Sequence, residues 1–211
     1  MVFYHHLPAR RRATTAYRER GTSIIEAAIV SLAFFTIIAI LFEGSGLVRD
    51  SLGVGNAVRT AARTATVNGE EVYADYYILR TIRREASAIG IDDLQRVVVY
   101  RADGFGNPPT TTCKNGTAFA GAPTTRVGAC NVYTRADLSR PQTDFACKSP
   151  SALDGPWCPT DRKVAESGPS GPPDYIGVYI KYTHDLITGL FKGQSTITDF
   201  VVIRMEPRKL S

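Results

Sequence analysis

The sequence predicts an α+β fold in which a long N-terminal transmembrane helix is followed by a second helix and a small antiparallel sheet. Three observations predict this order. An apolar segment near the N-terminus is long enough to cross a membrane, and helical periodicity continues beyond it. Segments rich in β-branched and alternating residues, typical of strands, come only later in the chain. Strands that follow helices, rather than alternating with them, favour α+β over a parallel α/β architecture.

The apolar segment runs from Ala27 to Phe42 without a charged residue, and Glu26 and Glu43 bound it. Counted from Thr22, a helix ending at Phe42 would be about 31 Å long, which suffices to cross a hydrocarbon core of about 30 Å. Glu26 would then lie about one turn inside the membrane. A carboxylate there is costly, so Glu26 is a functional candidate by default.

Positive charge is concentrated ahead of this segment. The chain has a formal net charge of +5, and residues 1–20 contain five arginines but only one acid. By the positive-inside rule, residues 1–21 form a basic cytoplasmic leader and the chain after Glu43 lies outside. Because the charge is a short juxtamembrane cluster without a groove-reading motif, we expect no nucleic-acid partner.

Two other interpretations of the N-terminal segment remain open. A cleaved secretory signal also has a basic start and an apolar run, and Gly44-Ser45-Gly46 offers small residues for a cleavage site. A plain single-span anchor would leave Glu26 without a role.

Helical periodicity extends past the membrane. Between Leu47 and Ala65, small and apolar residues recur at steps of three and four, so residues 22–67 are expected to form one transmembrane helix with an amphipathic extension. Asn68-Gly69 is a plausible stop, and Gly44–Gly55 is where a bend would fall. The stripe is expected to pack against the protein's own domain in its outer half. Val72 to Ile89 predicts a second amphipathic helix, which Gly90 closes.

Residues 68–211 are expected to form an exported α+β domain. The predicted strands are Arg96–Arg101, Tyr175–Thr183 and Ser195–Met205, and core candidates on the last are Ile197, Phe200, Val202 and Ile203. Residues 104–174 form an irregular insertion, broken by Gly and Pro, in which Arg126–Tyr133 could be a short strand. An apolar connector, Leu186–Phe191, joins the last two strands.

Four cysteines fall in this insertion, at Cys113, Cys130, Cys147 and Cys158. An even number of cysteines in a loop-rich exported region predicts two disulfides, and three pairings are possible. Sequential pairing, Cys113 with Cys130 and Cys147 with Cys158, closes the smallest loops and is the one we expect. Zinc binding is disfavoured because the spacings do not resemble those of metal sites.

Catalytic motifs are largely missing, which favours an interaction or structural protein without a cofactor, rather than an enzyme. His5 and His6 belong to the polar leader. His184 beside Asp185 could orient a nucleophile, but a solvent-facing pair at a strand end is the simpler interpretation. The adjacent acids Asp92-Asp93 and Glu70-Glu71 are expected in solvated turns. Several tyrosines could form a binding face, although core packing explains most of them equally well.

The order of features resembles the TadE-like minor pilins, or pseudopilins, of bacterial tight-adherence (Tad, Flp) pilus systems. The residues that carry the resemblance are Arg20-Gly21 followed by Glu26, the apolar helix to Phe42-Glu43, the alanine- and arginine-rich stretch Val54–Arg63, and Arg204-Met205-Glu206-Pro207. The first three cover residues 20–65. Residues 104–174 match no pattern of that family.

The resemblance implies cleavage by a prepilin peptidase between Gly21 and Thr22, on the cytoplasmic side, so that Glu26 becomes the fifth mature residue. The new amino group at Thr22 would be a cation at the apolar end of the helix. The carboxylate of Glu26, from the same or a neighbouring subunit, could neutralise it where the dielectric constant is low.

The leading interpretation is therefore a non-enzymatic minor pseudopilin, single-pass in the bacterial inner membrane, that helps to initiate, prime or tip a Tad-type pilus. Its partners would be the prepilin peptidase, other pilins or pseudopilins, the assembly platform and the lipid bilayer. Alternatives are an uncleaved TadG-like envelope protein that helps to assemble the secretion machine, a tethered module that binds a ligand through tyrosine-rich sheet and loops, and an exported enzyme.

Overall fold

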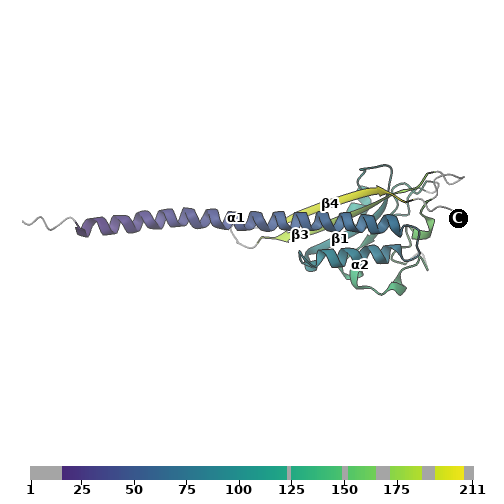
Figure 1. The fold of residues 1–211 in the computed structure, drawn as a ribbon, viewed down its shortest axis with the longest axis horizontal. Coiled ribbons are helices and arrows are strands. Elements are labelled where there is room, and N and C mark those ends of the chain that lie inside the picture. Colours follow the sequence, from purple (N-terminus) through teal and green to yellow (C-terminus); the bar gives the residue numbers. More distant parts are fainter. Residues whose placement is uncertain (1–15, 123–124, 149–151, 165–171, 187–192, 207–211) are drawn as a thin grey trace, which may run out of the picture. The chain divides into compact units, whose positions relative to one another are not determined.

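The structure, a computed structural model, describes residues 16–122, 125–148, 152–164, 172–186 and 193–206, with side chains from residue 21 onward. The predictions for His5, His6, most of the leader, and all but the first residue of the connector Leu186–Phe191 lie outside these residues. The described part is α+β, with a long apolar N-terminal helix, further helices, a four-stranded antiparallel sheet and two disulfides, as predicted (Figure 1).

Helix α1 spans Ala16–Val67, and its end at Val67 confirms the predicted stop. The chain divides into two compact units, residues 1–44 and residues 45–211, and each is described by itself below. Within the second unit, α1 buries a stripe of small and apolar side chains, which are Val54, Ala57, Val58, Ala61, Ala62 and Ala65. This confirms that the outer half of the stripe packs against the protein's own domain.

Helix α2 spans Ala74–Ala86 and lies beside the second half of α1 (Figure 1). The two helices approach closely because small residues line their contact. A side-chain carbon added at Gly53 would come within 2.2 Å of Ile89, just beyond α2. The helix is shorter than the predicted Val72–Ile89 because the chain after Ala86 tightens into turns, in which the Ile89 amide donates to the Ala86 carbonyl.

The sheet contains β1 (Leu94–Ala102), β2 (Cys130–Tyr133), β3 (Tyr175–Asp185) and β4 (Gln194–Arg204) in the order β2-β1-β3-β4. Every neighbouring pair is antiparallel, and Val98 pairs with Val132 on one side and Tyr179 on the other. All three predicted strands are present, and the short strand expected within Arg126–Tyr133 is β2, which begins at Cys130. Their β-branched and aromatic residues suit a pleated surface buried on both faces.

Each face of the sheet has its own apolar cluster. The helix-facing cluster joins α1 and α2 to alternate strand residues such as Ile176, Val178 and Ile180. The opposite cluster joins Val98, Tyr100, Tyr179 and Val202 to the Cys113–Cys130 disulfide. Among the core candidates on β4, Ile197 and Ile203 pack against the first cluster, whereas Phe200 and Val202 belong with the second.

The insertion packs on both sides of the sheet and is less irregular than expected. Cys113 belongs to the second cluster, whereas Leu138, Phe145 and Trp157 belong to the helix-facing one. It contains a helical turn, α3 (Thr111–Lys114), strand β2, and three 3₁₀ turns, η2 (Arg135–Ser139), η3 (Gln142–Asp144) and η4 (Pro159–Asp161). A further turn, η1 (Ile91–Asp93), precedes β1. Tyr100 donates to the Asn107 carbonyl at 2.8 Å, and Arg96 donates to the Lys114 carbonyl. Such short elements leave no periodic signal in a sequence, which is why the segment was predicted to be irregular apart from one short strand.

Candidate functional site

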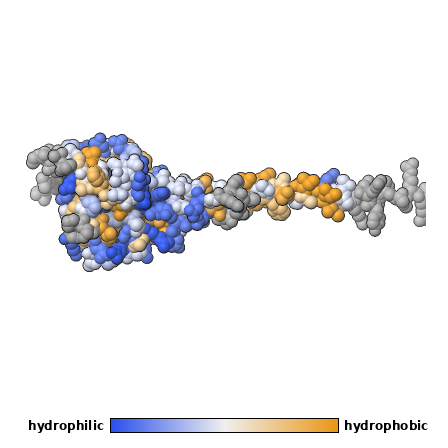
Figure 2. Space-filling view, turned by 180° about the vertical axis from the view of Figure 1, so that it is seen from behind, coloured by the Kyte–Doolittle hydropathy of each residue, from blue (hydrophilic) through white to orange (hydrophobic). Residues whose placement is uncertain are grey.

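The first candidate site is the apolar half of α1, residues 21–44. One helix of the described part, Gly21–Val67, is long and apolar enough to cross a membrane, and none of its most apolar stretch is buried within the protein. Apolar side chains along this stretch are exposed, and Figure 2 shows orange surface over much of it, interrupted by paler residues. The exposed side chains include Ile24, Ile29, Leu32, Phe35, Ile37 and Phe42. A signal sequence passes the same test of length and composition. So large an apolar surface needs a lipid or protein environment.

Polar groups inside this stretch are satisfied by the helix itself. The hydroxyl groups of Ser31 and Thr36 donate to the carbonyls of Ala28 and Leu32, at 2.9 and 2.8 Å. Backbone-bonded hydroxyls can enter lipid at low cost, because no donor is left without an acceptor. Glu26 cannot be satisfied in this way, since a carboxylate only accepts hydrogen bonds and the helical amides around it are already used.

Gly21, Thr22 and Glu26, the predicted processing and assembly residues, all lie on α1. Glu26 is exposed, and it follows Thr22 by four residues, so the two lie on one face of the helix. Gly21 is also exposed, and a side-chain carbon added there would meet no atom within 4 Å. A larger residue at position 21 would therefore leave the helix intact.

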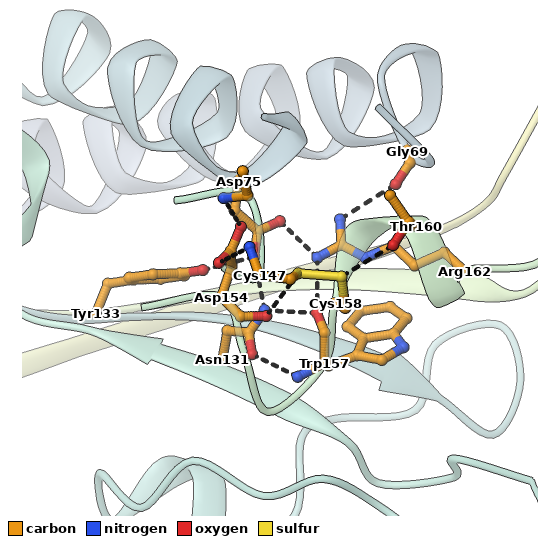
Figure 3. Close-up of polar contacts among 11 residues, drawn as sticks. Gly69, Asp75, Asn131, Tyr133, Cys147, Asp154, Trp157, Cys158, Thr160 and Arg162 are labelled. Carbon is orange, nitrogen blue, oxygen red and sulfur yellow. Dashed lines mark hydrogen bonds and ion pairs between the residues drawn. A yellow bond between two sulfur atoms is a disulfide. The ribbon is translucent and has the colours of Figure 1, made fainter. Parts of the chain in front are cut away.

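A second, fully buried polar cluster was not predicted from the sequence. Asp75 of α2 forms an ion pair with Arg162, with 2.6 Å between Oδ1 and the guanidinium, and both side chains are 0% exposed. The other oxygen of Asp75 accepts from the Tyr133 hydroxyl at 2.6 Å and from the Asn131 amide at 2.8 Å. Asn131 also bonds the backbone of Trp157 at both its carbonyl and its amide. Figure 3 shows these side chains converging on the carboxylate.

The cluster ties the second disulfide loop to the helices. Arg162 stacks on the indole ring of Trp157, with 4.4 Å from the guanidinium carbon to the ring centroid, and donates to the Gly69 carbonyl at 3.4 Å. The contacts join β2, α2 and the segment next to η4, which are far apart in sequence. Because each member is satisfied mainly by other members, we interpret this cluster as a structural clamp rather than a reactive site.

Asp154 fixes the turn inside the same loop. Its carboxylate accepts hydrogen bonds from the amides of Ala146 and Cys147, at 2.8 and 3.0 Å. Both of these residues have positive φ angles, 79° and 51°, which few side chains tolerate without such support. Burial raises the pKa of Asp154 above its usual value of 3.8, although the two amide hydrogen bonds oppose that shift.

Both disulfides have the predicted sequential pairing. Cys113 is bonded to Cys130, and Cys147 is bonded to Cys158. The first holds α3 against β2, and the second closes the loop that carries Asp154. Among the described residues, no group of three or more His, Cys, Asp and Glu side chains is placed to hold a metal ion.

The prediction for His184 was wrong. The side chain is buried, and its Nδ1 lies 2.7 Å from Oδ2 of Asp50 on the second half of α1. Its expected partner Asp185 is exposed and instead accepts from the Gln194 amide at 2.7 Å. The reason is that the end of β3 runs beside α1, where Gly46 leaves room for the imidazole. A contact over 134 residues has no local sequence signal.

The tyrosines mostly belong to the core. Tyr100, Tyr133, Tyr179 and Tyr182 are buried, and burial raises the pKa of each above its ordinary value. In contrast, Tyr77 of α2 is 41% exposed. The four buried tyrosines therefore present little surface to a ligand.

Comparison with known proteins identifies no relative. No protein-family model matches the chain, and neither a curated protein nor a solved structure matches it.

Proposed function

We propose that this protein is a membrane-anchored minor pseudopilin that helps to assemble or prime a Tad-type bacterial pilus, and that it performs no catalysis. One observation carries the proposal. Within residues 22–42, one charged side chain, Glu26, stands five residues after Gly21 on a lipid-compatible helix whose exposed surface is mostly apolar. An anchor alone has no need of such a group, and keeping it within a bilayer costs about 2.5–3.5 kcal/mol at the centre of a helix and less near an end.

Cleavage after Gly21 gives this carboxylate a partner. The amino group created at Thr22 is a cation, and it lies one helical turn from Glu26. In a bundle of such helices, the amino group of one subunit can meet the carboxylate of the next, and the low dielectric constant strengthens the attraction. A subunit that enters without this pairing carries an uncompensated charge, so the carboxylate selects correctly processed and correctly staggered neighbours.

The proposed location is the bacterial inner membrane, with the basic leader inside and the α+β domain outside. Two properties of the chain support this orientation. The arginine-rich leader favours the cytoplasmic side. The two disulfides, with no free cysteine among the described residues, fit an oxidising compartment. The partners would be the prepilin peptidase, other pilins or pseudopilins, and the assembly platform.

Processing is tested by N-terminal sequencing of the protein extracted from membranes. The proposal predicts a mature chain that starts at Thr22. The Gly21→Val variant should migrate more slowly than the wild type in gel electrophoresis because its leader is retained. A side chain at position 21 would clash with no other atom, so a folding defect would not account for a change in processing.

Two other outcomes would overturn the proposal. A wild-type chain that starts at Met1 and migrates like Gly21→Val would favour an uncleaved, TadG-like envelope protein. A start near Gly46 would indicate a secretory signal and would remove Glu26 from the mature protein.

A further inference from the structure

A groove lined by polar and charged residues lies between the second half of α1 and α2, at the surface of the second unit. Its volume is about 310 Å³, and we call it the hairpin groove. The residues that line it come from both helices, which run side by side in Figure 1, and are Thr64, Asn68, Tyr77, Arg80, Thr81 and Arg84. Neither the apolar half of α1 nor the proposed role of Glu26 involves this surface.

The groove has more positive charge than its own structure uses. Arg80 and Arg84 line it, Arg83 adjoins them, and Arg63 precedes Thr64 on α1. Among the described residues, the one ion pair of these four arginines joins Arg84 to Glu85, at 3.4 Å and largely in solvent. Placing like charges three and four residues apart on a helix is unfavourable by a few tenths of a kcal/mol per pair.

The helix dipole explains only part of this arrangement. Arg83 and Arg84 fall in the last turn of α2, where positive side chains are stabilising. Arg80 lies before that turn, and α1 has no basic residue in its own last turn, so Arg63 gains nothing from the dipole of α1. Instead, Arg80 rests 5.6 Å from the ring centroid of Tyr76, which holds its guanidinium at the edge of the groove.

The lining chemistry favours a sugar over a protein segment. The lining includes hydroxyl and amide groups, with Thr64 and Thr81 in hydrogen-bond contact at 3.3 Å and Asn68 donating to the Thr64 carbonyl. A protein partner would need apolar anchor pockets at the centre of the contact, and the lining residues provide none. The exposed ring of Tyr77 offers a flat face at the side of the groove.

We propose that the hairpin groove binds an anionic glycan, with Arg80 and Arg84 paired to carboxylate or phosphate groups and Tyr77 stacked on a sugar ring. Guanidinium groups suit both anions because their planar donors match two oxygens at once. The assumption that glycans are available rests on the proposed export of this domain. Binding itself is independent of cleavage at Gly21 or of pilus assembly.

The test measures binding of soluble oligosaccharides to the full chain in zwitterionic detergent micelles by isothermal titration calorimetry. Tetragalacturonate provides carboxylates, and phosphorylated maltotetraose provides phosphate. Two control ligands each lack one feature: neutral maltotetraose has the sugar without the charge, and a tetraglutamate peptide has the charge without the sugar. We expect at least one anionic glycan to bind at least about tenfold more tightly than either control ligand, a difference of about 1.4 kcal/mol.

Matched variants distinguish binding at the hairpin groove from non-specific attraction between the glycan and the protein's positive charges. The double variant Arg80→Gln/Arg84→Gln should weaken glycan binding at least about tenfold, whereas Arg59→Gln/Arg204→Gln removes the same charge from exposed positions outside the groove and should have little effect. Tyr77→Leu should weaken glycan binding but leave any tetraglutamate binding unchanged. The proposal is overturned if neither anionic glycan binds, if both double variants lose the same amount of glycan affinity, or if tetraglutamate binds as tightly as the glycans.

Discussion

The buried pair of Asp75 and Arg162 gives the sharpest prediction about the fold. Asp75→Asn keeps the size of the side chain but leaves the Arg162 charge without its counter-ion, in a site where both side chains are 0% exposed. Loss of one partner of such a pair costs about 3–5 kcal/mol. Asp75 also accepts from Tyr133 and Asn131, and an amide oxygen is a weaker acceptor than a carboxylate. We therefore expect the unfolding free energy to fall by about 3–5 kcal/mol.

Trp157 makes the effect directly measurable. It is the only tryptophan in the chain, and its ring stacks against Arg162. Urea unfolding of the full chain in detergent, followed by tryptophan fluorescence, therefore reports on this cluster. The exposed pair of Arg135 and Asp92 is the matched control, because its atoms are 2.8 Å apart but its side chains are 54% and 85% exposed. Asp92→Asn should cost less than about 1 kcal/mol.

A double variant completes the experiment. Asp75→Asn combined with Arg162→Met removes both charges, so it should cost less than the sum of the two single changes. The Nε atom of Arg162 has no hydrogen-bond partner among the described residues. The contacts of the ion pair therefore do not fully offset the free-energy cost of removing its charges from water. The interpretation of the cluster as a clamp would be refuted if Asp75→Asn cost no more than Asp92→Asn, or if the two changes at the buried pair were additive.

Three further predictions concern the sheet and the insertion. Gly177→Ala should destabilise the domain by about 1–3 kcal/mol in urea unfolding, because the added carbon would lie 2.2 Å from the Tyr100 ring. Replacing Cys113 and Cys130 with alanine should cost about 3 kcal/mol by the same assay, since the bond closes a loop with a sequence separation of 17. For Asp154, the raised pKa means that the unfolded state releases its proton first, so stability relative to Asp154→Asn should fall as the pH rises above 3.8.

Each of these has a simple check. Gly104→Ala is the control for Gly177→Ala, because its added carbon would meet the nearest atom at an ordinary 3.5 Å. The stability difference between the wild type and the Cys113/Cys130 variant should disappear when both proteins are measured under reducing conditions that open every disulfide. A pH dependence identical in the wild type and Asp154→Asn would show that burial does not perturb this carboxyl group.

Local patterns were enough to predict most of the framework. Asn68-Gly69 predicted the end of α1 at Val67, and alternation predicted a strand at Tyr175–Thr183, which the structure extends to Asp185. The short connection between the last two strands predicted the antiparallel sheet. The disulfide pairing was also predicted, because closing a small loop needs less order than closing a large one. These features depend on residues that are close together in the sequence.

Long-range polar pairs were not predictable in the same way. Asp75 and Arg162 are 87 residues apart, and His184 and Asp50 are 134 apart, so neither partner indicates the other. One signal was available for Asp75. It falls on the same helix face as Ile78 and Ile82, and an acid on an apolar face suggests a buried partner. The identity of that partner needed the fold.

The role of Glu26 is beyond both sequence and fold, because its proposed partner belongs to another subunit. The most direct measurement is the amount of this protein in the pilus fraction sheared from intact cells, compared between the wild type, Glu26→Asp and Glu26→Gln at equal levels in the membrane. We predict that Glu26→Asp is recovered with the pili and Glu26→Gln is not, because only aspartate retains a charge to pair with the amino group of Thr22. Wild-type recovery of Glu26→Gln in assembled pili would contradict this account.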